Sequence, residues 1–143
     1  MIGVGFTNPT TNKWEYKCFC SNSISFIDER GVLVKFHNYI NHIIKKYHKG
    51  KNTPNFYHWS HAEKTFYNNA MTRYHLLEEK YPTLKNANIS IPSIKWCDFI
   101  NVFKGEPIVI RGSLNFSLKS IAKAFYNNGF IKTVWDDSSD ITN

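Results

Sequence analysis

The stretch that decides the fold is residues 55–63, NFYHWSHAE, where an apolar run passes directly into a helical pattern. The aromatic residues of NFYHW are types enriched in strands, so this segment predicts a short buried strand. From about Ser60 to Lys80 apolar residues recur every three or four positions, which predicts a helix that ends before Pro82. A strand leading straight into a helix is typical of α/β domains, whose ligands collect at the carboxyl ends of strands.

Two interpretations of Glu63 are open from these residues alone. The tetrapeptide Ser60-His61-Ala62-Glu63 fits the capping-box pattern, in which Ser and Glu satisfy each other's backbone N–H groups. Alternatively, Glu63 lies where a metal site would be built, with His58 and His61 beside it. Spacing favours the cap, because one carboxylate does not establish a metal site.

Outward from this segment, the N-terminal region predicts a β-hairpin. MIGVGF and KWEYKCFC are strand-forming runs, and the turn-forming cluster TNPTTN separates them. In the second run Trp14, Tyr16, Cys18 and Cys20 alternate with Glu15, Lys17 and Phe19. We therefore expect the first set to form the inward face, with both cysteines packed in the core rather than bound to a metal.

The remaining segments complete an α/β order. A helix of roughly 20 residues with an apolar stripe follows the hairpin, with Ser25 and Asp28 as its cap and Gly50 at its end. SIKWCDF predicts a strand that runs into a short helix, and PIVIRG fits either a strand or an extended loop. A last helix begins after the cap residue Ser117 and stops at Gly129.

Composition limits the class of protein. A length of 143 residues with 42% hydrophobic residues fits one domain spanning 1–143. A formal charge of +7 favours an anionic partner such as nucleic acid, although a merely soluble basic protein fits as well. Three cysteines without Cys-x-x-Cys spacing indicate a reduced, intracellular protein without structural zinc. No apolar run reaches the roughly 18 residues of a membrane span.

Several motifs together resemble a known family. HWSHAE ahead of a helix, then WCDFINVF, then SLKSIAKAF, are similar in order and spacing to the DEDD-type 3′–5′ exonuclease branch of the ribonuclease H-like superfamily. The similarity covers almost the whole chain. It is closest to the YprB-like, or predicted RecB-like, nuclease subgroup, which includes versions from large DNA viruses. The resemblance implies a ribonuclease H-like fold, a mixed sheet flanked by helices.

The resemblance also implies a site and its chemistry. Such nucleases hydrolyse the phosphodiester bonds of DNA or RNA with two Mg²⁺ or Mn²⁺ ions, held by carboxylates from several elements. Glu63 is the implied metal ligand and Asp98 the second implied catalytic acid, although capping the short helix after its strand suits Asp98 better. His58, His61 and Lys119 are the implied contacts to nucleic acid. The cluster Asp136, Asp137 and Asp140 suits a solvated turn better than the site.

Two parts of the family pattern have no counterpart here. The family's D-x-E pair lies on a central first strand that would precede Met1, and its last acid lies in a helix that would follow Asn143. We therefore expect a fragment without its central strand, inactive alone, from a protein in which a helicase or nuclease domain could be fused. The alternative function is a non-catalytic nucleic-acid-binding or structural domain of the same fold.

Overall fold

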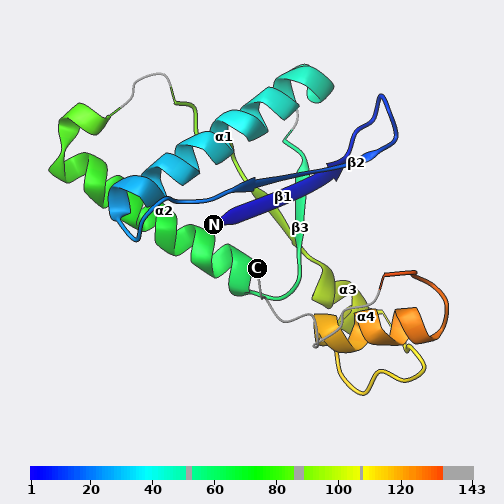
Figure 1. Cartoon of the computed structure of the whole chain (residues 1–143). Coiled ribbons are helices and arrows are strands. Elements are labelled where there is room, and N and C mark those ends of the chain that lie inside the picture. Colours follow the sequence, from blue (N-terminus) through cyan, green and yellow to red (C-terminus); the bar gives the residue numbers. More distant parts are fainter. Residues whose placement is uncertain (51–52, 86–88, 107, 134–143) are drawn as a thin grey trace. The chain divides into compact units, whose positions relative to one another are not determined.

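The computed structural model describes residues 1–50, 53–85, 89–106 and 108–133. Helices and strands alternate along this part of the chain (Figure 1), which confirms the predicted α/β class. No helix within it is long and apolar enough to cross a membrane. In chain order the elements are β1 (Ile2–Thr7), β2 (Trp14–Phe19), α1 (Phe26–His48), β3 (Asn55–His58), α2 (Ala62–Lys80), the 3-10 turn η1 (Pro82–Leu84), β4 (Lys95–Asp98), α3 (Phe99–Gly105) and α4 (Leu118–Asn127).

The chain forms two compact units. The first unit comprises Met1–Phe56 and Ala62–Cys97, and the second comprises Tyr57–His61 and Asp98–Asn143. Within the described residues the strands make two separate pairs, β1 with β2 and β3 with β4, instead of the single mixed sheet that was predicted. The ribonuclease H-like arrangement and the assignment of 1–143 to one domain stay predictions.

The predicted hairpin is confirmed. Strands β1 and β2 are antiparallel, with Ile2 opposite Phe19 and Thr7 opposite Trp14. The connection is closed by Asn8, whose backbone N–H donates to the carbonyl of Lys13 at 2.9 Å and whose side-chain oxygen accepts from two following backbone N–H groups. An asparagine that bonds its own backbone in this way is a common turn former.

The predicted orientation of the hairpin is wrong. Phe19 is buried at 7% exposure, whereas Trp14 and Tyr16 are 69% and 64% exposed. Cys18 and Cys20 are both exposed. The face that carries the two cysteines therefore points away from the core of the first unit.

The partner strand explains this reversal. Side chains at paired positions of two strands share one face of the sheet, so Ile2 and Val4 lie on the face of Phe19. The opposite face of β1 carries Gly3 and Gly5, which offer no side chain to bury. The face with apolar side chains on both strands is the one that packs against α1, since it removes more apolar surface from water.

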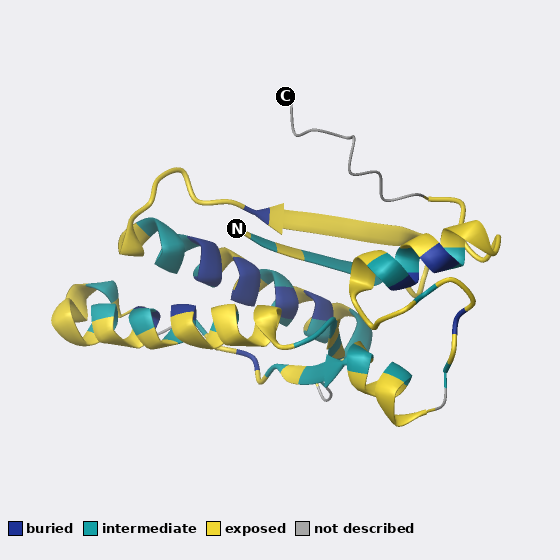
Figure 2. Cartoon of the chain, turned by 90° about the horizontal axis from the view of Figure 1, so that it is seen from below, coloured by how far each residue is buried: buried dark blue, intermediate teal, exposed yellow. Residues whose placement is uncertain are grey.

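Helix α1 supplies most of the core of the first unit. Its buried residues recur at helical spacing (Figure 2), in agreement with the predicted apolar stripe. One cluster joins α1 to the hairpin and a second joins it to α2 through Leu33, Ala70 and Tyr74. The first cluster contains the buried residues Phe19, Val32, Phe36 and Ile40.

Two ion pairs also connect α1 to α2. Arg30 Nη2 lies 2.7 Å from Glu78 Oε1, and both side chains are largely buried. Arg73 makes two bonds to the carboxylate of Glu29, at 2.6 and 2.7 Å. The two-bond geometry of an Arg–carboxylate pair gives direction as well as attraction, so these contacts help to set how the two helices align.

Both ends of α1 match their predicted signals. Ser25 has extended backbone, and its hydroxyl accepts from the backbone N–H of Asp28 at 3.1 Å. At the other end Lys49 is left-handed, and the N–H of Gly50, itself at φ 72°, donates to the carbonyl of Ile44. These bonds satisfy backbone groups that the helix leaves without partners at its termini.

Replacement of Ser25 by alanine is expected to lower the free energy of unfolding by about 1 kcal/mol, because the N–H of Asp28 loses its acceptor. Urea denaturation followed by far-UV circular dichroism measures this change. Ser21→Ala, in the exposed segment just before the helix, is the matched control and is expected to have no effect. Equal stability of the two variants would contradict the capping role.

The second unit has its own small core. Ile110, Ile121 and Ala124 are buried, with partly buried apolar side chains around them, among them Trp59 and Phe103. Residues 108–110 form an extended loop rather than a strand, which settles the alternative left open for PIVIRG in its described part. Helix α4 begins as predicted, with the hydroxyl of its cap residue accepting from a backbone N–H three residues later.

Candidate active site at the ends of strands β3 and β4

The carboxyl ends of β3 and β4 meet at one edge. Asp98 is the last residue of β4, and Ser60 lies two residues beyond the end of β3. The backbone N–H of Ser60 donates to Oδ1 of Asp98 at 2.8 Å. Both residues belong to the second unit. This is the kind of strand edge at which α/β proteins build ligand sites.

Asp98 is the N-cap of α3, as its sequence context favoured. Its Oδ1 also accepts from the backbone N–H of Ile100 at 3.1 Å, so one oxygen serves both α3 and Ser60. The carboxylate is thus held through Oδ1, and an ionised carboxylate has further lone pairs on its second oxygen with which to bind a cation.

Ser60 has a strained backbone. Its φ of 70° lies in the left-handed region, which a non-glycine residue enters at a cost of roughly 1 kcal/mol or more. Two hydrogen bonds hold it there: its N–H donates to Asp98, and its carbonyl accepts from Nδ1 of His58. Strain that the surroundings enforce is a recurrent feature of functional sites.

This conformation overturns the capping-box prediction for Ser60. A capping serine has extended backbone, and α2 begins at Ala62, so the N-cap position falls on His61. The hydroxyl of Ser60 lies 3.1 Å from Nδ1 of His61. The N–H of Ser60 instead donates a hydrogen bond to Asp98, and this bond competes with the capping geometry. The spacing of residues in the sequence did not reveal it.

The two histidines have different surroundings. A carbonyl only accepts, so the bond to Ser60 requires a proton on Nδ1 of His58 and leaves Nε2 as an acceptor when the ring is neutral. His58 is partly buried, whereas His61 is exposed. His58 therefore orients the Ser60 backbone, and His61 is placed to meet a ligand from solvent.

Trp59 anchors the turn after β3. Its indole N–H donates to the carbonyl of Phe116 at 3.0 Å, and its ring lies 5.1 Å from that of Phe103, centroid to centroid. An open pocket of about 640 Å³ lies beside it in the second unit. Residues of the turn, of α3 and of the loop before α4 line it: Trp59, Ser60, Ile100, Lys104, Leu114, Asn115, Phe116, Ser117 and Leu118.

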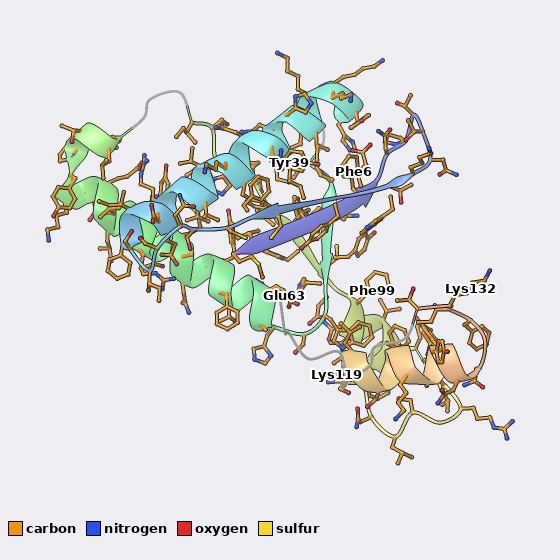
Figure 3. All side chains as sticks on the ribbon, in the orientation of Figure 1. Phe6, Tyr39, Glu63, Phe99, Lys119 and Lys132 are labelled. Atoms are coloured by element: carbon orange, nitrogen blue, oxygen red, sulfur yellow. The ribbon has the colours of Figure 1, made fainter. Side chains whose placement is uncertain are left out.

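Two basic side chains lie near the pocket of the second unit. Lys104 lines the pocket, and Lys119 is exposed in the first turn of α4 (Figure 3). Over its full sequence this unit balances five basic side chains with five acidic ones, of which Asp98 and Glu106 are described. The formal charge of +7 therefore comes from the sequence of the first unit.

Glu63 lies in the first turn of α2, within the first unit, and is exposed (Figure 3). A negative charge there interacts favourably with the partial positive charge of the helix N-terminus. Its role as a metal ligand stays a prediction. Asp136, Asp137 and Asp140 lie outside the described residues.

Within the described ranges, no three or more His, Cys, Asp or Glu side chains are grouped so that they could hold a metal ion. The carboxylates described in the second unit are those of Asp98 and Glu106, and the one at this strand edge is Asp98. An ion bound to it would complete its coordination with water, as Mg²⁺ commonly does.

Sequence reasoning missed two parts of the site. It assigned no partner to Trp59. An indole N–H at the end of a buried strand needs a hydrogen-bond acceptor, so a partner such as the carbonyl of Phe116 could have been expected. Sequence reasoning also missed the left-handed backbone of Ser60, for which serine carries no signal, because glycine and asparagine are the residues that favour that region.

In comparisons with known proteins, no family model, no curated protein and no solved structure matches the chain. The fold and site thus define a class, an α/β protein with a polar site where two strand ends join.

Proposed function

We propose that this chain is a metal-dependent nuclease domain, acting on nucleic acid as a 3′–5′ exonuclease. The observation that carries the proposal is the position of the Asp98 carboxylate, which two backbone N–H groups hold through Oδ1 at the end of β4. The formal charge of +7 on the whole chain supports a polyanionic substrate. The resemblance in motif order supplies the reaction class.

The proposed roles follow from side-chain chemistry. Asp98 and Glu63 offer the hard oxygen ligands that Mg²⁺ and Mn²⁺ prefer. Such an ion, when bound, lowers the pKa of a water and stabilises charge on phosphate oxygens. His61 and Lys119 contact substrate phosphates, and His58 holds the turn that carries Ser60.

The test of Asp98 is the broadening of backbone amide signals by Mn²⁺ in nuclear magnetic resonance. In the wild type, sub-stoichiometric Mn²⁺ is expected to broaden Ser60, Asp98 and Ile100 first, because its paramagnetic effect is strongest near the ion. Asp98→Asn is the informative variant, since asparagine caps a helix as well as aspartate does and only the charge is lost. It is expected to abolish the local broadening while α3 persists.

Glu106→Gln is the control for that experiment, because Glu106 is the other described carboxylate of the second unit and is exposed at the end of α3. Broadening that persists in Asp98→Asn, or that disappears in Glu106→Gln, would contradict the proposed role of Asp98. Glu63→Gln is tested separately, by the loss of broadening at the first turn of α2.

A nucleic-acid-binding module without hydrolysis is the second candidate. The exposed rings of Trp14 and Tyr16 on the hairpin favour it, since bases stack on such rings. It predicts binding of single-stranded nucleic acid that weakens steeply with salt and ignores both Mg²⁺ and Asp98→Asn.

A further inference from the structure

The exposed end of β2 carries two thiols side by side. The sulfur atoms of Cys18 and Cys20 lie 3.6 Å apart, and both residues are exposed. They flank Phe19, whose side chain points the opposite way into the core. Alternation along the strand thus places both sulfurs on one face, turned toward solvent.

The backbone between the two thiols is held in place. The ring of Phe19 packs against those of Phe36, at 6.1 Å, and Tyr39, at 5.7 Å between centroids. Cys18 pairs with Gly3 in the hairpin, and the hydroxyl end of Tyr16 occupies the space over that glycine, beside Cys18. The pair is therefore held in place, and both of its residues are exposed.

Two sulfur atoms at this spacing match the edge of a tetrahedral metal site. With a metal–sulfur distance of about 2.3 Å, a separation of 3.6 Å corresponds to an S–metal–S angle of about 103°, close to the tetrahedral value. We propose that Cys18 and Cys20 form a two-thiolate binding site for a soft divalent cation of the zinc type.

The chemistry of the site differs from that of Asp98. Each thiol releases its proton as the ion binds, and no electron is transferred. Thiolates select soft ions and leave Mg²⁺ to oxygen ligands. Since the described residues contain no larger cluster of metal-ligating side chains, water completes the coordination in the isolated chain.

An intrachain disulfide fits the geometry less well. It needs a sulfur–sulfur distance of about 2.05 Å, with Cα atoms about 4.4–6.8 Å apart and most often about 5.5–6 Å. Residues i and i+2 of an extended strand lie roughly 6.6 Å apart, at the upper end of that range, and the buried Phe19 resists the contraction that closure demands. A bridging ion requires no such movement.

Titration of the reduced protein with Cd²⁺, a soft probe ion, tests the proposal. The wild type is expected to bind one Cd²⁺ per chain with the ultraviolet absorption of a thiolate–cadmium bond. Cys18→Ser and Cys20→Ser are each expected to weaken binding by about 100-fold and to remove most of that absorption.

Cys97→Ser is the matched control, because Cys97 is the third thiol and lies in β4. It is expected to bind Cd²⁺ like the wild type, and excess Mg²⁺ is expected not to compete. Far-UV circular dichroism verifies that each variant is folded. Wild-type affinity in the folded Cys18→Ser variant, or loss of binding in Cys97→Ser, would overturn the proposal.

Discussion

Phe36→Ala is expected to destabilise the chain by about 3–5 kcal/mol, which is a large part of the stability of a typical domain. Phe36 is 4% exposed, and its ring packs edge-on against Phe19, Phe56 and Tyr67, with centroids 6.1 to 6.4 Å apart. Alanine would remove these contacts and leave a cavity, since surrounding aromatic rings relax only in part.

Phe66→Ala is the matched control for that substitution. Phe66 lies on α2 in the same unit but is 72% exposed, so the same chemical change removes little buried surface. Denaturation in guanidinium chloride, followed by tryptophan fluorescence and circular dichroism, compares the two. A loss below about 1 kcal/mol for Phe36→Ala would contradict the core described above.

His37 is expected to make stability fall as pH drops from about 6.5 to 4. Its side chain is fully buried, and burial lowers the pKa of the imidazole to about 4. Nε2 lies 2.9 Å from the hydroxyl of Tyr67, and Nδ1 is buried with no hydrogen-bond partner among the described residues. The folded core therefore holds the neutral ring.

The sign of the effect follows from proton uptake. Between pH 6.5 and 4 the unfolded chain binds a proton on this imidazole while the folded chain does not, so acidification favours unfolding. The contribution of the neutral His37 ring to the free energy of unfolding is complete above pH 6.5 and is lost as the pH approaches 4. Its maximum is about 3 kcal/mol.

Urea denaturation at several pH values measures this dependence. The double variant His37→Leu with Tyr67→Phe removes the titrating group together with the hydroxyl that it would leave unpaired. It is expected to flatten the curve between pH 4 and 6.5, whereas His42→Gln, at an exposed histidine of α1, is expected to leave the curve unchanged. An unaltered slope in the double variant would show that other groups cause the acid sensitivity.

Local signals in the sequence predicted most elements of the fold. The helical period located α1, α2 and α4 to within a few residues, cap residues located the starts of α1 and α4, and the turn cluster after β1 located the hairpin. Asp98 was also recognised as a cap from its position between a strand and a helix. These features depend on residues near one another in the chain, which is why they could be read from it.

Features that depend on distant partners could not be predicted. The hairpin has apolar residues on both faces of β2, and the choice between them depends on Gly3 and Gly5 of the partner strand and on packing against α1. The pairing of strands and the strained Ser60 likewise depend on contacts with residues far along the chain.

If a divalent ion on Asp98 joins the chain to nucleic acid, the affinity for a labelled single-stranded oligonucleotide depends on that ion, and it is measured with Mg²⁺ and with a chelator. Mg²⁺ is expected to tighten binding to the wild type and to Glu106→Gln but not to Asp98→Asn. Equal affinity with and without Mg²⁺ in the wild type, or an undiminished effect of Mg²⁺ in Asp98→Asn, would contradict this role of the ion.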